Sequence, residues 1–261
     1  MKFKDLNDEK RLYDKLMHML SKKTYEDSVE FIDDIVKDPK LKFILSLGFG
    51  GKFADYKLKL TKKNIEVYKL IPTQNEIGFE ETLKFLCSGK NLEKCFDTPA
   101  VIKTPIVTFR GTFIIDGHHR WSEIYATNPK AKVKCIDIDG NLSPIQMLKC
   151  VQATIGSNLG YLIHKDSQGK NLLNASEKEI KNYIVSNIEK DKFLKYYKDP
   201  VNDIVNNCEM LKHNNSPVLG SPSRGYMPQT SKDPDLLDDL KKGITKIWKT
   251  LQKKISNLNQ R

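Results

Sequence analysis

The residue types best suited to chemistry in this chain stand together in the run "DGHHR", from Asp116 to Arg120. Two of the five histidines are adjacent here, and an arginine follows them at once. A short apolar run ends before this group and a helical pattern begins inside it, which predicts a strand that turns into a helix at Gly117. The first N–H groups of a helix lack internal partners and carry partial positive charge. The sequence therefore predicts a corner that binds an anion.

The side chains of this corner suit phosphate. Arginine presents a fork of donors that matches phosphate oxygens, and histidine donates a hydrogen bond or moves a proton near neutral pH. The residues expected to hold phosphates are Gly117, His118, His119 and Arg120. Asp116 is expected to cap the helix, orient a histidine or hold Mg²⁺. An alternative stays open, in which the histidines are ordinary first-turn residues and Arg120 forms a surface ion pair.

A set of strands and one helix is expected around this corner. The predicted strands cover 64–72, 106–109, 112–115 and 131–139, and the predicted helix covers 118–128. The strands at 106–109 and 112–115 are separated only by Arg110-Gly111, which indicates a hairpin with a tight turn. Together these elements predict a compact α+β domain over 61–140.

An acidic residue follows the first of these strands. The run "PTQNE" places Glu76 three residues after Thr73. This is the spacing of a capping box, in which the two side chains satisfy backbone N–H groups at a helix start. The sequence therefore predicts that a helix begins near Thr73, and Glu76 is explained as part of its cap.

The N-terminal segment, 1–60, is expected to be helical. Leucines recur at every fourth position over 12–20 and so share one helical face. The run "TYED" at 24–27 is similar to a capping box. A further short helix is expected over 39–47 and should stop at the glycines of 48–51. No GK[ST] follows these glycines, so they do not form a Walker loop.

The chain beyond the α+β domain divides into three expected parts. The segment 141–212 is expected to be helical, with one helix opened by Ser176 and Glu179 at capping-box spacing. The prolines and weak periodicity of 213–234 predict an extended linker. In the last segment, 235–261, apolar residues at spacings of three and four predict an amphipathic helix that covers 235–258. That helix docks on the body, contacts a second copy or another partner, or binds a membrane or nucleic acid through its lysines.

The overall composition limits the class of protein. Hydrophobic residues make up 39% of the 261 residues, which is enough for a core of useful size. No apolar run approaches membrane-spanning length, so we expect no membrane partner. The five cysteines include no CxxC pair, and the N-terminus shows no apolar signal segment. These features argue against a zinc site and favour the cytoplasm. The net charge of +11 either reflects a lysine-rich solvated surface or favours polyanionic partners such as DNA, nucleotides or an anionic membrane surface.

The corner motif and its surroundings resemble the ParB/sulfiredoxin superfamily. "DGHHRW" is similar to the strand-to-helix motif of ParB-like domains and of the free-serine kinases related to them. "VYKLIPTQNE" resembles the first motif of that fold, and the order of elements from 64 to 139 is also similar. "KFILSLGFGG", "LIPTQNEIGFEETL" and "SRGYMPQT" resemble segments of ParB-like proteins encoded by tailed bacteriophages.

The resemblance implies a nucleotide-binding cleft and the transfer or hydrolysis of a nucleotide phosphate. The "GHHR" residues at 117–120 would then hold a nucleoside triphosphate with Mg²⁺ at Asp116. Glu76 would match the acidic residue of the first motif, and in a kinase it would be the general base for an acceptor hydroxyl. His119 and Asp116 would complete the catalytic residues. The implied location is the cytoplasm of a bacterial host or a phage virion.

Two departures from the superfamily narrow these expectations. His118 stands where sulfiredoxin has its reactive cysteine, so repair of a sulfinic acid is not expected. No clear helix-turn-helix follows residue 140, so centromere recognition as in ParB is not expected. The leading hypothesis is a phosphotransferase or NTPase. The alternative is a non-catalytic, DNA-associated or virion-packaged phage protein, ahead of a nuclease, for which a compact carboxylate cluster is missing.

Overall fold

The structure, a computed structural model, describes residues 6–42, 59–90, 92–102, 104–140, 142–159 and 169–227. The glycines of 48–51 and the helix expected over 235–258 lie outside the described residues. The short helix expected over 39–47 is described as far as 42, and 39–42 is helical.

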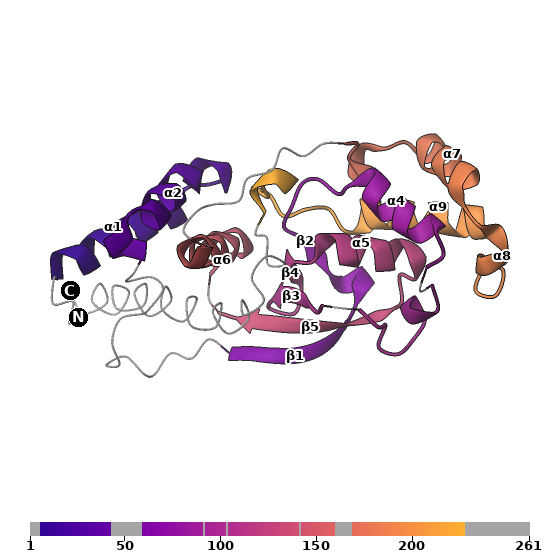
Figure 1. Cartoon of the computed structure of the whole chain (residues 1–261), viewed down its shortest axis with the longest axis horizontal. Coiled ribbons are helices and arrows are strands. Elements are labelled where there is room, and N and C mark those ends of the chain that lie inside the picture. Colours follow the sequence, from indigo (N-terminus) through magenta and orange to yellow (C-terminus); the bar gives the residue numbers. More distant parts are fainter. Residues whose placement is uncertain are drawn as a thin grey trace.

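A five-stranded mixed sheet forms the centre of the fold (Figure 1). Its strands are β1 (Lys59–Glu66), β2 (Ile71–Pro72), β3 (Ile106–Phe109), β4 (Phe113–Asp116) and β5 (Lys132–Asp139). Their order across the sheet is β1-β5-β3-β4-β2. The pairs β1/β5 and β3/β4 are antiparallel, whereas β3/β5 and β2/β4 are parallel. The "DGHHR" corner therefore begins at the end of β4, beside the short edge strand β2.

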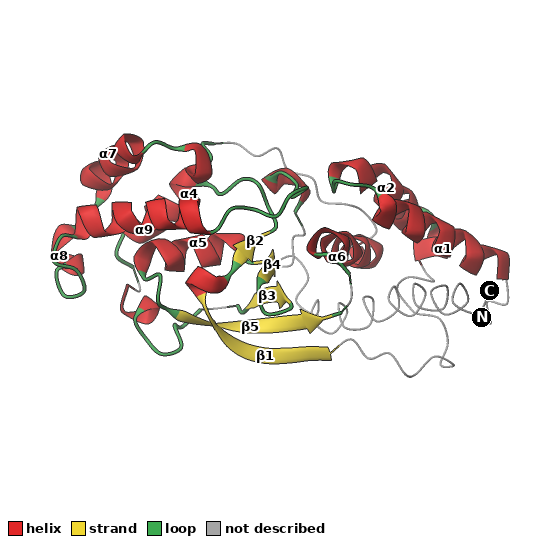
Figure 2. Cartoon of the chain, turned by 180° about the vertical axis from the view of Figure 1, so that it is seen from behind, coloured by secondary structure: helices red, strands yellow, loops and turns green. Residues whose placement is uncertain are grey.

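Helices lie on both sides of this sheet (Figure 2). The α-helices are α1 (Leu6–Ser21), α2 (Val29–Lys37), α4 (Phe79–Cys87), α5 (His118–Thr127), α6 (Pro144–Leu159), α7 (Glu177–Asn187), α8 (Lys190–Phe193) and α9 (Pro200–Asn214). Short 3₁₀ helices are η1 (Glu26–Ser28), η2 (Val67–Lys69), η3 (Leu92–Cys95), η4 (Leu172–Asn174) and η5 (Arg224–Tyr226). The fold is α+β, as predicted. Among the described helices, none combines the length and apolarity needed to cross a bilayer.

Two hydrophobic cores lie on opposite faces of the sheet. Successive strand residues point to opposite faces, so Ile106 joins one core and Val107 the other. Ile114 and Ile115 divide between the cores in the same way. The first core packs under α4, α5, α7 and α9, and the second under α1, α2 and α6. The corner helix α5 is therefore held on one face, while the N-terminal helices share the other face with α6.

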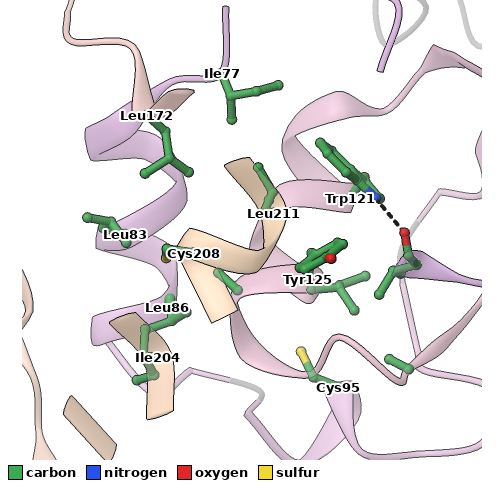
Figure 3. Packing of buried hydrophobic residues seen from close by; sticks show 14 of the residues in the cluster. Ile77, Leu83, Leu86, Cys95, Trp121, Tyr125, Leu172, Ile204, Cys208 and Leu211 are labelled. Carbon is green, nitrogen blue, oxygen red and sulfur yellow. Dashed lines mark hydrogen bonds between the residues drawn. The ribbon is translucent and has the colours of Figure 1, made fainter. Parts of the chain in front are cut away.

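The core beneath α5 is built around Trp121, which is fully buried (Figure 3). Its indole N–H donates to the carbonyl oxygen of Val67 over 2.9 Å. Its ring meets Tyr125 edge-on, with centroids 5.7 Å apart. Leu83 of α4 and Leu211 of α9 belong to the same cluster. Burial of these large rings and the indole hydrogen bond fix α5 against its neighbours.

The helix start predicted at Thr73 is wrong. Helix α4 begins at Phe79, after its N-cap Gly78. The N–H of Thr73 donates to Nε2 of His118 over 3.1 Å, and its hydroxyl donates to the carbonyl of Ile114. Because both polar groups of Thr73 bond to residues far along the chain, they do not cap a local helix. The strand predicted over 64–72 is also interrupted, since η2 separates β1 from β2.

Several local predictions are confirmed. The turn between β3 and β4 is formed by Arg110 and Gly111, with φ of 53° and 66°. Two adjacent positive φ angles are typical of a type I′ turn, which the N–H of Thr112 closes by donating to the carbonyl of Phe109, and the register then pairs Phe109 with Phe113. Ser176 and Glu179 make the reciprocal hydrogen bonds of a capping box at the start of α7.

The stretch 213–234, expected to be an extended linker, is described as far as 227. Helix α9 continues to Asn214. Residues 215–227, which we name the strap, then run back across the body and end in η5. The strap is tied to the turn after β2, because the N–H of Val218 donates to the carbonyl of Pro72 over 3.1 Å. This part of the chain is a packed element of the fold.

Candidate functional site

The predicted corner is a left-handed glycine at the start of a helix. Gly117 is the N-cap of α5 with φ of 101°, and no side chain caps this end. The N–H groups of the first turn have no carbonyl partners within the helix. A Cβ on Gly117 would lie 2.8 Å from Nη2 of Arg120, so the guanidinium folds back over this residue. The backbone angle favours glycine here, and a larger residue would displace the Arg120 guanidinium.

The His118 side chain points into the fold and is 4% exposed. Its Nε2 accepts the N–H of Thr73, so the proton of the neutral ring must be on Nδ1. Burial lowers the pKa of His118 to about 3, and the charges of His119 and Arg120 act in the same direction. His118 therefore joins α5 to the turn after β2.

His119 lies half-buried on the same first turn. Its Nδ1 is buried and has no hydrogen-bond partner among the described residues. Burial lowers the pKa of His119, and the nearby Arg224 and Arg120 lower it further. Glu81 and Asp116 act in the opposite direction. His119 is thus a neutral ring at neutral pH, and it lies among two arginines and two carboxylates.

Arg120 faces back towards the end of β4. Its Nη2 donates to Oδ2 of Asp116 over 3.0 Å and to the carbonyl of Pro105 over 3.5 Å. Its Nε is buried and has no hydrogen-bond partner among the described residues. Since a guanidinium has five N–H donors, Arg120 keeps donors for an anion even while it is paired with Asp116.

Asp116 forms an ion pair, which bears on its expected role as a Mg²⁺ ligand. Its carboxylate is 15% exposed and pairs with Arg120. Across the described residues, no cluster of three or more histidine, cysteine, aspartate or glutamate side chains could hold a metal ion. Mg²⁺ would need phosphate oxygens and water for its remaining ligands, as it usually does at nucleotide sites. Asp116 is the carboxylate of the corner that would contact it.

Glu76 lies in the turn before α4, outside the corner. Its Oε2 accepts the N–H of Arg224 over 3.0 Å. Within the described chain it makes no hydrogen bond to the "DGHHR" residues, and it does not cap α4. The structure thus joins Glu76 to the backbone of Arg224. Among the described residues, no hydrogen bond to the corner supports the expected role of Glu76 as a general base.

Two residues that the sequence did not assign to the site lie beside His119. Nη1 of Arg224, from the strap, donates to Oε1 of Glu81 on α4 over 2.8 Å. Burial acts to raise the pKa of Glu81, but the hydrogen bond from Arg224 and the backbone bond outweigh it, so the pKa is lowered. The motif "SRGYMPQT" pointed to this segment. No local spacing connects Arg224 with residues more than 100 positions earlier.

Glu123 is a third residue that the sequence did not assign. It follows Arg120 by three residues on α5, which places the two on neighbouring positions of one helix face. Burial raises the pKa of Glu123 to about 7, although Arg120 acts to lower it. A carboxyl group that changes charge near neutral pH therefore stands next to the corner. Its spacing was visible in the sequence, but its burial was not.

Comparisons of this chain with protein-family models, curated proteins and solved structures found no match. The likeness to the ParB/sulfiredoxin superfamily therefore rests on the motifs quoted above. The function must be argued from the corner itself.

Proposed function

We propose that this protein binds the phosphate groups of a nucleoside triphosphate at the corner Asp116–Arg120. The observation that supports this most directly is a pair of buried polar atoms, Nε of Arg120 and Nδ1 of His119, that have no hydrogen-bond partner in the described part of the chain. Both lie on the uncapped first turn of α5. A buried polar atom without a partner costs about 1–3 kcal/mol, so a ligand that supplies acceptors there is stabilised.

The charge of this corner selects an anionic ligand. The guanidiniums of Arg120 and Arg224 are paired with the carboxylates of Asp116 and Glu81, so the positive end of α5 and the N–H donors that these pairs leave over favour an anion. Phosphate matches this set because its oxygens accept several hydrogen bonds at once. The resemblance of "DGHHRW" to ParB-like domains points to the same ligand class.

The activity that we propose is phosphotransfer or nucleotide hydrolysis. Arg120 and the N–H groups of α5 would neutralise charge on the transferred phosphoryl group. His119, neutral at neutral pH, would be able to accept a proton from an attacking hydroxyl or water. Asp116 would orient Arg120 and contact Mg²⁺, which shields phosphate charge when bound.

A thermal-shift screen of nucleoside triphosphates with MgCl₂ tests the proposal. We expect the wild-type protein to gain several degrees of melting temperature with at least one nucleotide. The gain should vanish in Arg120→Gln and His119→Ala. It should persist in Arg110→Gln, which removes one charge at the hairpin turn, the opposite end of β4. Absence of binding to every triphosphate, by melting and by calorimetry, would rule out the proposed function.

A second candidate is a non-catalytic protein that holds DNA phosphates at the same corner. The net charge of +11 favours it. DNA affinity should then fall steeply with salt concentration and should be higher than the affinity for free nucleotides. Measurement of DNA binding by fluorescence anisotropy over a salt series, with Arg120→Gln as the variant, separates the two candidates.

A further inference from the structure

The strap brings a second arginine to the corner. After α9, Nδ2 of Asn215 donates to the carbonyl of Leu70 over 2.7 Å. The N–H of Asn75 donates to the carbonyl of Pro222 over 2.9 Å. These hydrogen bonds align the strap with the segment from β2 to α4. Arg224 follows two residues after Pro222.

The far end of the strap is anchored on the N-terminal helices. The N–H of Ser223 donates to Oε1 of Glu26 over 3.1 Å. Met227 is buried in the core shared by α1, α2 and α6. In Figure 1, η5 at the yellow end of the colour scale lies between α6 on one side and α4 and α5 on the other. The position of Arg224 is therefore fixed from both sides.

Two glutamates hold Arg224 in place. Its N–H donates to Glu76, and its Nη1 donates to Glu81 over 2.8 Å. A Cβ on Gly78 would lie 2.8 Å from Nη1 of Arg224, so the absence of a side chain at Gly78 lets the guanidinium approach α4. The side chain of Arg224 is 27% exposed, which leaves it within reach of a ligand.

A hydrogen bond between α4 and α5 lies one residue from Glu81, the partner of this guanidinium. Glu81 precedes Thr82, whose hydroxyl lies 2.9 Å from that of Ser122. Ser122 also lies 3.0 Å from the carbonyl of His119, to which its hydroxyl donates. The charge of Arg224 is the largest cause, after burial, of the lowered pKa of His119. His119 thus has Arg120 on its own helix and Arg224 on the strap as cationic neighbours.

We propose that Arg224 is a second phosphate ligand, which makes the site selective for a chain of two or three phosphates over a single phosphate. Glu81 holds the guanidinium when no ligand is bound and competes with the ligand for it. One guanidinium can serve only part of a polyphosphate, whereas two arginines from different elements can contact two phosphate groups. This inference rests on the proposed function, because it assumes that Arg120 binds phosphate.

Calorimetric titration with orthophosphate, pyrophosphate and tripolyphosphate tests the selectivity. The wild-type protein should bind pyrophosphate and tripolyphosphate more tightly than orthophosphate. Arg224→Gln should weaken pyrophosphate and tripolyphosphate binding by about 10- to 100-fold, the effect of one lost charge-assisted hydrogen bond, and change orthophosphate binding little. Glu81→Gln should strengthen pyrophosphate binding, because it frees Arg224. The control Arg110→Gln should match the wild type.

The possible failures are distinguishable. If no phosphate compound binds the wild type, or if Arg120→Gln binds as the wild type does, the proposed function fails. If Arg120→Gln abolishes binding but Arg224→Gln keeps the wild-type preference for pyrophosphate, only the role of Arg224 is overturned. The Glu81→Gln variant keeps Arg224, so it tests the idea even if Arg224→Gln is poorly folded. Unchanged or weaker pyrophosphate binding in folded Glu81→Gln would contradict the competition.

Discussion

The N–H of Thr73 donates to Nε2 of His118 over 3.1 Å, although 45 positions separate the two residues in the chain. This hydrogen bond ties the turn after β2 to the first turn of α5. It also gives the two adjacent histidines different surroundings. His118 is oriented by the fold, whereas Nδ1 of His119 has no hydrogen-bond partner within the described structure.

Replacement of His118 by phenylalanine tests the importance of this hydrogen bond. Phenylalanine also has an aromatic ring, but the buried N–H of Thr73 loses its acceptor. The free energy of unfolding should therefore fall by about 1–3 kcal/mol. Urea unfolding measures the change. His213→Phe is the control because the His213 side chain is 75% exposed, and it should change stability by less than about 0.5 kcal/mol. A His118→Phe protein as stable as the control would contradict the prediction.

The same histidine should make stability depend on pH. Its pKa is about 3 in the fold and about 6.5 in an unfolded chain. Between these values the unfolded state binds a proton that the folded state does not, so stability falls as the pH is lowered. The slope approaches about 1.4 kcal/mol per pH unit, and the His118→Phe variant should lack it. The difference in unfolding free energy between the two proteins should therefore be smaller near about pH 5 than near about pH 7. Parallel curves would argue against a buried neutral His118.

A matched pair of glycines tests the corner. Gly117 and Gly169 have φ of 101° and 109°, so alanine at either position should cost about 1–2 kcal/mol. The new methyl group would crowd Arg120 only in Gly117→Ala, because a Cβ on Gly169 has nothing within 4 Å among the described residues. Both variants should melt earlier than the wild type. Triphosphate affinity, measured by calorimetry, should fall in Gly117→Ala alone. An equal loss of triphosphate affinity in both variants would indicate that Arg120 does not contact the ligand.

Glu123 should destabilise the protein when the pH rises through neutrality. Its pKa is about 7 in the fold and about 4.3 in an unfolded chain, so the folded state holds more protons between these values. Stability contributed by the protonated carboxyl is therefore lost as the pH rises across this window. Glu123→Gln should raise the melting temperature more at about pH 8 than at about pH 4. The exposed Glu80, replaced by glutamine, serves as the control, and the same pH profile in both variants would contradict the prediction.

The hairpin illustrates what could be predicted from the sequence. Arg110-Gly111 between two short apolar runs indicated the β3–β4 turn, and the structure has positive φ at both positions. The helix after Gly117 and the capping box at Ser176 were also predicted from local sequence patterns. Each depends on residues within about four positions of one another, which is the range of helix and turn hydrogen bonds. The α+β class followed from such patterns.

The hydrogen-bond partners of Thr73 and Glu76 could not be predicted from local spacing. Their spacing matched a capping box, yet Thr73 bonds to His118 and Ile114, and Glu76 bonds to Arg224. A capping box forms only if no distant partner is more favourable. Such partners exist once β2 lies beside β4, and that pairing has no signature in local spacing.

The sequence by itself determined the strand-to-helix corner, because a short apolar run, a glycine and a helical pattern meet within a few residues of Asp116. The tertiary structure decided which histidine is buried. It also decided that Arg224 reaches Glu81, 143 positions away, through the strap. Burial and long-range ion pairs depend on how helices pack over the two faces of the sheet. That packing follows from the whole set of apolar surfaces at once, so no single motif encodes it.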